Sequence, residues 1–176
     1  QSQDDGHEGA PLLPCIEVIR TPAGIMISQR HYILNLLYKF GMAKCKSVAT
    51  PLDRNLKLEV DSSTIVCEQT RYRQLIGSLI HLTITRPDLS YPVGLLRQFM
   101  QTPRDIHLDC AKRVLRYVSG TMDFGILYRV AMPIRLEGYT KADWAGYKAD
   151  RRSTSGFVFS LGSGAISRSS KKQPTF

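Results

Sequence analysis

The sequence predicts an α+β fold in which a helical segment precedes a run of β-strands. Apolar residues recur at helical spacing in three stretches, which are residues 28–40, 69–83 and 103–119. After about residue 122, short β-type runs replace this spacing, at residues 125–129, 136–140, 156–161 and 165–169. A chain of 176 residues with 43% hydrophobic residues is long enough to bury a real core.

The first elements are expected to be a hairpin and a helix. Residues 1–11 are polar and locally acidic, and we expect them to be disordered. Residues 15–20 and 24–28 flank Thr-Pro-Ala and indicate a β-hairpin with a short loop. Ser28 can cap the helix that follows, and Gly41 is its expected C-terminal stop.

Three further helices are expected before the strands. The first spans residues 69–83, and its core-facing residues are Tyr72, Leu75, Ile76, Leu79 and Ile80. The second follows the helix-breaking Arg86-Pro87-Asp88 and must accommodate Pro92, which costs about 3 kcal/mol beyond a first turn. In the third, Thr102 is the expected cap, Pro103 the first helical residue and Gly120 the end.

The charge balance points to a polyanionic partner. The net charge is +9, with 24 Lys and Arg against 15 Asp and Glu. Lys112, Arg113 and Arg116 are expected on the exposed side of the last helix, where Lys112 and Arg116 lie one turn apart. Two interpretations remain open: contacts to a phosphate backbone without base recognition, or a solvated helix face.

A second basic group lies near the C-terminus. Residues 130–176 contain eight Lys and Arg against three Asp and Glu. Its candidate nucleic-acid-binding residues are Arg151, Arg152, Lys171 and Lys172. The same two interpretations apply, and neither group indicates a metal site.

The strand at residues 136–140 and the residues after it offer few metal ligands. Glu137 and Asp143 are the nearby carboxylates, whereas two-metal phosphodiester chemistry needs several. An ordinary strand end is therefore favoured over a metal-binding edge. The four cysteines form no C-x-x-C pair, which favours reduced thiols in an intracellular protein, and no apolar run is long enough for a membrane span.

Several motifs occur in one order along the chain: ISQRHYI at 27–33, YRQLIGSLIHLTITRPD at 72–88, HLDCAKRVLRYVSG at 107–120, GYTKADWAG at 138–146, residues 150–161, and SSKKQPT at 169–175. Together they closely resemble the Pol polyprotein of copia-type LTR retrotransposons, over about residues 12–176. The resemblance implies a passage from the end of the reverse transcriptase into the start of RNase H.

The resemblance implies three parts. Residues 12–43 would be the end of the reverse-transcriptase palm, and residues 44–128 a helical thumb- or connection-like region that holds the template–primer duplex. Residues 129–176 would form a truncated RNase H-like domain, an incomplete mixed sheet containing its first three strands. The implied partners are DNA, RNA or an RNA–DNA hybrid, bound without sequence specificity, and the remainder of the Pol polyprotein.

Departures from the family pattern argue against activity of the chain alone. Lys141 stands where the family has its first metal-binding Asp, and Asp143 is the surviving carboxylate. By the same resemblance, the polymerase aspartate pair lies upstream of residue 1 and the next RNase H carboxylate lies past Phe176. Intact members of the family use Mg²⁺, whereas no cofactor is expected for this chain. Unusual residues such as Pro92 and Arg168 indicate a degenerate fragment.

Three hypotheses follow from these observations. The first is a catalytically inactive fragment that binds nucleic acid non-specifically. The second is a subdomain that is active only within a full-length polyprotein. The third is a repurposed protein-interaction module without a nucleic-acid role. Whether the chain acts as an enzyme is left open, and the expected location is the cytoplasm or the nucleus, away from membranes.

Overall fold

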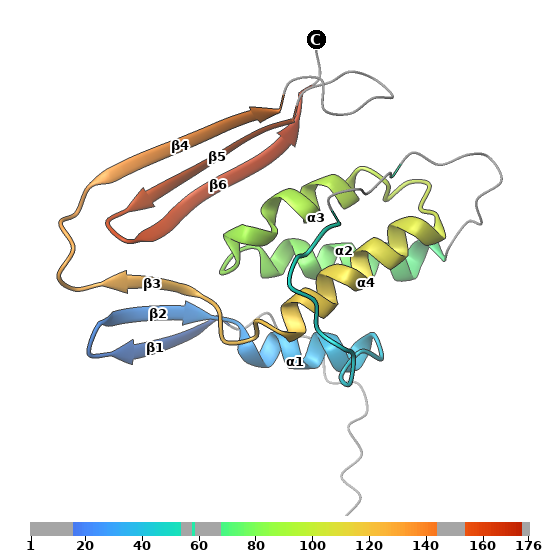
Figure 1. The fold of residues 1–176 in the computed structure, drawn as a ribbon, viewed down its shortest axis with the longest axis horizontal. Coiled ribbons are helices and arrows are strands. Elements are labelled where there is room, and N and C mark those ends of the chain that lie inside the picture. Colours follow the sequence, from blue (N-terminus) through green and yellow to red (C-terminus); the bar gives the residue numbers. More distant parts are fainter. Residues whose placement is uncertain (1–15, 54–57, 59–67, 144–153, 174–176) are drawn as a thin grey trace, which may run out of the picture.

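The computed structural model describes residues 16–53, 58, 68–143 and 154–173. Within these residues the chain forms four α-helices, one short 3₁₀ helix and two three-stranded antiparallel sheets (Figure 1). The presence of both helices and sheets confirms that the fold contains α and β structure, as predicted. The expected mixed sheet is wrong for the described residues: both of their sheets are antiparallel throughout.

The first sheet joins the two ends of the helical part. The predicted hairpin is confirmed as β1 (Glu17–Thr21) and β2 (Gly24–Ser28). Strand β3 (Ile126–Arg129) adds to the other edge of β2, giving the order β1-β2-β3. Gly24 has a φ of 149°, and a Cβ there would lie 2.0 Å from the Tyr128 carbonyl oxygen, so the close approach of β3 requires glycine.

The N-cap of the first helix lies one residue later than the cap that the sequence suggested. Helix α1 (Arg30–Lys39) has Gln29 at its N-cap, and no side chain forms a cap hydrogen bond there. Ser28 is instead the last residue of β2 and is buried, so it cannot serve as the cap. Gly41 ends the helix as expected: its φ is 69°, and its amide donates to the Tyr38 carbonyl.

The remaining helices form the core together with α1. They are α2 (Gln69–Leu82), the 3₁₀ helix η1 (Pro87–Leu89), α3 (Ser90–Arg97) and α4 (Asp105–Ser119). Tyr72, Leu75, Ile76 and Leu79 are buried, as predicted. The prediction for Ile80 is wrong, because its side chain is 37% exposed, and Leu82 is buried instead. Pro92 is the third residue of α3, within the first turn, where proline is tolerated.

The start of α4 also differs from the expectation. The helix begins at Asp105 with Arg104 as its N-cap, so Thr102 and Pro103 lie before it. The structural reason is His107, whose Nδ1 accepts a hydrogen bond from the Arg104 backbone amide at 3.0 Å. Gly120 is the C-cap residue, so the predicted end is confirmed.

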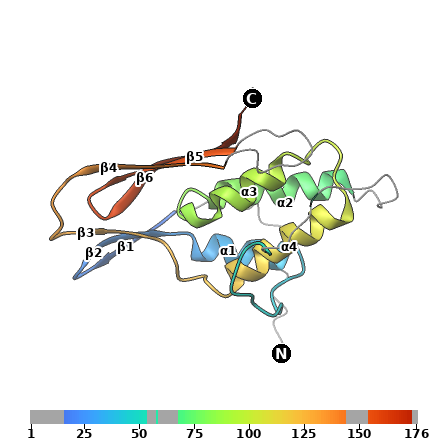
Figure 2. The same cartoon turned by 45° about the horizontal axis from the view of Figure 1, so that its top comes forward.

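The second sheet is a separate layer against α3. It consists of β4 (Leu136–Asp143), β5 (Thr154–Leu161) and β6 (Gly164–Lys172), in that order. Figure 2 shows this sheet lying on one side of α3, and β6 makes the contacts to that helix. The opposite sheet face carries Phe157 and Phe159, whose ring centroids are 5.3 Å apart. Phe159 is 38% exposed and its ring covers Gly138.

Hydrogen bonds tie the two sheets together at the β5–β6 turn. The Ser163 hydroxyl accepts from the Arg129 backbone amide at 2.8 Å and donates to the Leu127 carbonyl at 2.9 Å. The Tyr128 hydroxyl donates to the Ala165 carbonyl at 3.0 Å. None of the helices that the structure describes has both the length and the apolar character needed to span a bilayer.

Candidate nucleic-acid interface

Helix α4 presents one face to the core and a basic face away from it. The buried face comprises His107, Cys110, Ala111, Val114, Leu115 and Val118. The helical spacing therefore places Lys112, Arg113 and Arg116 between these positions. These are the three cations that the sequence suggested for phosphate contact.

Lys112 is the most accessible of the three cations. Its Nζ lies 3.3 Å from Asp109 Oδ1 in an i,i+3 ion pair whose two side chains are both exposed. Exposed pairs of this kind stabilise a protein by roughly 0–1 kcal/mol. The ammonium group can therefore exchange Asp109 for a phosphate at little cost.

Arg113 and Arg116 are partly exposed, and both form contacts to the chain before α2. Arg116 Nε donates to the Lys46 backbone carbonyl at 2.8 Å. Arg113 Nη2 donates to the Thr50 hydroxyl at 3.2 Å and lies 4.0 Å from Asp53 Oδ2. Both guanidinium groups thus hold the segment before residue 54 against the helix.

This anchoring brings two further lysines to the same surface. Lys44 and Lys46 are exposed, and Cys45 Sγ between them lies 3.5 Å from Ser119 Oγ at the end of α4. We define the basic surface as Lys44, Lys46, Lys112, Arg113 and Arg116. Sequence reasoning missed the two lysines, because they lie about 60 residues before the helix and no local spacing links them to it.

Of the four C-terminal candidate cations, Lys171 is the one whose side chain lies in the described part of the chain. Lys171 is exposed on β6, which packs on α3. Lys172 is the last residue of β6, but its side chain lies outside the described residues. Arg151 and Arg152 also lie outside them. These four positions stay predictions from the sequence.

His107 links the start of α4 to Leu58 and Phe99. Its ring stacks on Phe99 with centroids 3.8 Å apart, and its Nε2 lies 3.3 Å from the Leu58 carbonyl oxygen. Because Nδ1 accepts from the Arg104 amide, the proton of the neutral ring belongs on Nε2, which donates to Leu58. Burial lowers the pKa of His107, the Leu58 hydrogen bond opposes this, and Arg104 lowers it further.

We expect the stability of the fold to fall on acidification because of His107. The unfolded chain gains a proton near the ordinary pKa of 6.5, whereas the folded ring resists it. The stability contribution is therefore complete above pH 6.5 and is lost as the pH falls toward the lowered pKa of the folded state. Urea unfolding between pH 7.5 and 5 measures this loss. His107→Gln should reduce it, whereas variant His31→Gln, which removes an exposed histidine, should retain it.

Arg86 fixes the C-terminal end of α4 relative to η1. Its side chain is 1% exposed and forms a two-pronged ion pair with Asp88, at 2.8 and 3.0 Å. It also donates to the carbonyl and hydroxyl oxygens of Thr121, both at 2.8 Å. Tyr117 on α4 donates to the same Asp88 carboxylate at 3.0 Å. This network sets the direction of the helix that carries the basic surface.

Strand β4 carries the residues at which the sequence suggested metal chemistry. Glu137 Oε2 accepts a hydrogen bond from the Tyr139 hydroxyl at 3.1 Å, and this contact raises the pKa of Tyr139. Lys141 is exposed two residues further along. Asp143 ends the strand, and its side chain lies outside the described residues.

Comparison with known proteins shows the family of the chain. It is 45% identical over 167 residues to the retrovirus-related Pol polyprotein from transposon RE1 of Arabidopsis thaliana, covering 95% of this chain and 11% of that protein. The corresponding protein from transposon RE2 of the same plant is 46% identical over 167 residues, covering 95% and 12%. The protein from transposon TNT 1-94 of Nicotiana tabacum is 36% identical, covering 88% and 12%.

The chain belongs to the Pol polyproteins of copia-type retrotransposons. It spans about one ninth of the length of the Pol polyproteins that it matches. No protein-family model matches it, and no solved structure matches it. The three Pol polyproteins above confirm the family resemblance that the sequence motifs indicated.

The Mg²⁺ chemistry implied by the Pol resemblance does not fit the described side chains of β4. Mg²⁺ is held by carboxylate and other oxygen ligands, and the ammonium group of Lys141 is not a ligand for it. In the part of the chain that the structure describes, no three His, Cys, Asp or Glu residues gather where they could hold a metal ion.

Proposed function

We propose that the chain is a piece of the reverse transcriptase and RNase H region of a copia-type Pol polyprotein, that it is catalytically inactive alone, and that it binds nucleic acid non-specifically. The observation that carries the binding proposal is the basic surface. Five cations from α4 and from residues 44–46 gather there against two nearby carboxylates, Asp53 and Asp109.

The chemistry of the basic surface favours phosphate contacts over base recognition. The lysines are mobile point charges, which follow a backbone of any sequence. Arg113 and Arg116 already donate to Thr50 and to the Lys46 carbonyl, so they have fewer donors left for a base edge. Contacts to phosphates position a duplex without conveying its sequence.

The order of the motifs along the chain supports the assignment to three parts. We assign residues 12–43 to the end of the palm, 44–128 to the helical region that holds a template–primer duplex, and 129–176 to the start of an RNase H-like domain. The order β4-β5-β6 fits the first three strands of that domain. The proposed partners are DNA, RNA or their hybrid and the rest of the polyprotein, in the cytoplasm or the nucleus.

Removal of two exposed lysines from the basic surface should weaken the salt dependence of binding. Each phosphate contact contributes about −0.9 to the slope of log affinity against log salt for a duplex. The double variant Lys46→Ala/Lys112→Ala should therefore flatten the slope by about two units. Neither side chain is buried, so the fold is retained. A fluorescence titration of a labelled duplex at several salt concentrations measures the slope.

The matched control removes the same charge elsewhere. Arg20 and Arg135 are exposed and lie outside the basic surface, so Arg20→Ala/Arg135→Ala should leave the slope near that of the unaltered chain. An equal flattening by the two double variants would contradict a localised site, because it would trace the effect to net charge alone.

We expect no metal-dependent cleavage of an RNA–DNA hybrid by the chain. Lys141 places a positive charge where an ion would need a carboxylate, so neither Mg²⁺ nor Mn²⁺ should support the reaction. Lys141→Asp alone should not restore activity, because one or two carboxylates cannot position two ions. Gel analysis of an end-labelled hybrid tests this, with an active RNase H as the positive control. Specific cleavage that stops on chelation would contradict the proposal.

The exposed apolar face of the second sheet favours one alternative function. Phe159 and Leu161 are 38% and 41% exposed, which suits a repurposed protein-interaction module. Binding to a protein partner that persists at a salt concentration where duplex binding is lost would favour this alternative.

A further inference from the structure

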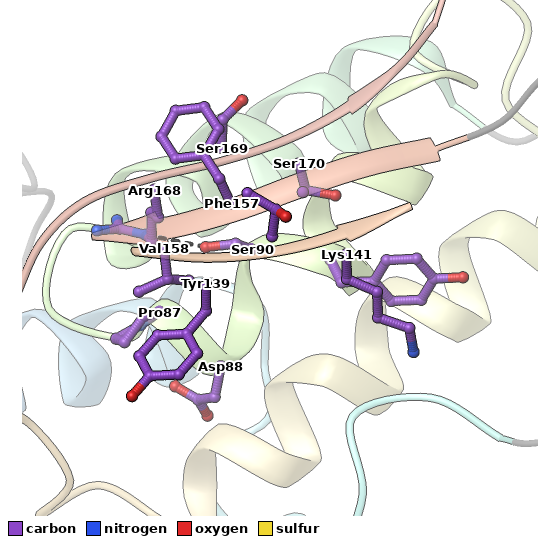
Figure 3. A pocket seen from close by; sticks show the side chains of 13 residues that line it. Pro87, Asp88, Ser90, Tyr139, Lys141, Phe157, Val158, Arg168, Ser169 and Ser170 are labelled. Atoms are coloured by element: carbon purple, nitrogen blue, oxygen red, sulfur yellow. Dashed lines mark hydrogen bonds between the residues drawn. The ribbon is translucent and has the colours of Figure 1, made fainter. Parts of the chain in front are cut away.

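Two neighbouring cavities lie between α3 and the second sheet, away from the basic surface. Their volumes are about 480 and 390 Å³. They share Ser90 and residues 168–170, so together they form one groove along β6, which we call the α3–β6 groove. Figure 3 shows the larger part, with Asp88 and Ser90 on one side and Tyr139, Lys141 and Arg168 from the sheet.

The charges that line the α3–β6 groove are mainly positive. Lys141 lines the larger cavity, Arg97 lines the smaller one, and Arg168 lines both. Asp88 is the single carboxylate among the lining residues, and it is already paired with Arg86 at 2.8 Å. The groove is therefore suited to an anion.

Arg168 is held in place between the two cavities. Its Nε donates to the Ser90 hydroxyl at 2.9 Å, and its Nη1 donates to the Ile84 carbonyl at 3.3 Å. Burial lowers the pKa of Arg168, and Asp88 opposes this. A guanidinium group stays protonated in proteins, so Arg168 offers a fixed positive charge with Nη2 left to donate to a ligand.

The two cavities differ in character. The smaller one is lined by the hydroxyl groups of Thr83, Ser90 and Ser170 in addition to its two arginines. The larger one is lined by Tyr91 and Tyr139, which are 49% and 65% exposed, and by Val158. A phosphate suits the first environment, and an aromatic base that stacks on a tyrosine suits the second.

We propose that the α3–β6 groove binds one nucleoside monophosphate unit, with its phosphate at Arg97 and Arg168 and its base in the tyrosine-lined cavity beside Lys141. The volumes are those of small-ligand sites and cannot admit a duplex. This unit is either a free nucleotide or the phosphorylated end of a single strand. The site is distinct from the basic surface and does not rest on it.

The probes for this site are AMP, adenosine and inorganic phosphate, titrated into the full chain and followed by NMR. AMP should saturate and should bind at least tenfold tighter than either part alone. Arg97→Ala/Lys141→Ala, which removes two exposed side chains, should weaken AMP binding at least tenfold, because each replacement loses a charged hydrogen-bond donor to the nucleotide. Arg20→Ala/Arg135→Ala and Lys46→Ala/Lys112→Ala should leave AMP binding unchanged.

Each outcome decides the proposal. The proposal would be overturned if AMP binding did not saturate. It would also be overturned if Arg20→Ala/Arg135→Ala weakened AMP binding equally, or if inorganic phosphate bound as tightly as AMP. Loss of duplex binding with AMP binding retained in Lys46→Ala/Lys112→Ala separates it from the function proposed for the basic surface. A 5′-phosphorylated dinucleotide then distinguishes the two ligands. If it binds at least as tightly as AMP, the ligand is the end of a strand; if it binds more weakly, the ligand is a free nucleotide.

Discussion

Replacing Arg86 with alanine is expected to lower the free energy of unfolding by about 3–5 kcal/mol. The guanidinium is buried and donates to Asp88 and to two oxygens of Thr121. Its loss leaves the Thr121 carbonyl and the Asp88 carboxylate without these donors, and it removes the cation that lies over the Tyr117 ring at 5.5 Å. Urea unfolding monitored by circular dichroism measures the change.

The control for Arg86 is an ion pair with the same distance on the surface. Arg30 Nη1 lies 2.8 Å from Asp123 Oδ1, with side chains 50% and 78% exposed. Arg30→Ala should therefore change the unfolding free energy by roughly 0–1 kcal/mol. Arg86→Lys keeps a charge but loses the two-pronged geometry, so it should also be destabilising. Similar losses for Arg86→Ala and Arg30→Ala would contradict the role given to the buried network.

Truncating Leu79 on α2 is expected to destabilise the chain by about 2–5 kcal/mol. Leu79 has no exposed surface, so Leu79→Ala removes apolar contacts and leaves a cavity in the core. The adjacent Ile80 is 37% exposed, so Ile80→Ala should cost well under half as much. Thermal and urea unfolding of the two variants provide the comparison. Equal costs would show that α2 is rotated relative to the described core.

Local patterns predicted the elements well because their causes are local. The hairpin at residues 17–28 is confirmed, as are the ends of α1 at Gly41 and of α4 at Gly120. Glycine and turn residues act within a few positions, so one sequence reveals them. Ile80 shows the limit of this reasoning. Helical spacing predicted that Ile80 faces the core like Leu79, but the buried face of α2 is narrower than its row of apolar residues, and Ile80 lies outside it.

Features that join distant residues could not be predicted in this way. Strand β3 pairs with β2 about 100 residues earlier, and the β-pattern of residues 126–129 does not specify that partner. The start of α4 depends on a buried histidine that replaces the expected threonine cap. The sequence predicted the cations of α4 that belong to the basic surface. It could not predict Lys46, which is held there because its backbone carbonyl accepts a hydrogen bond from Arg116, 70 residues later in the chain. The sequence likewise did not predict the contact between Arg86 and Thr121.

The central proposal is that this piece of a Pol polyprotein contacts the nucleic-acid backbone without recognising bases. The most direct test titrates the unaltered chain with two duplexes of equal length and unrelated sequence over a series of salt concentrations. We expect matching affinities, in the roughly 10⁻⁴–10⁻⁶ M range, and matching slopes of about −3 to −4.5, as three to five phosphate contacts would give. A slope near zero, or a clear preference for one sequence, would contradict it.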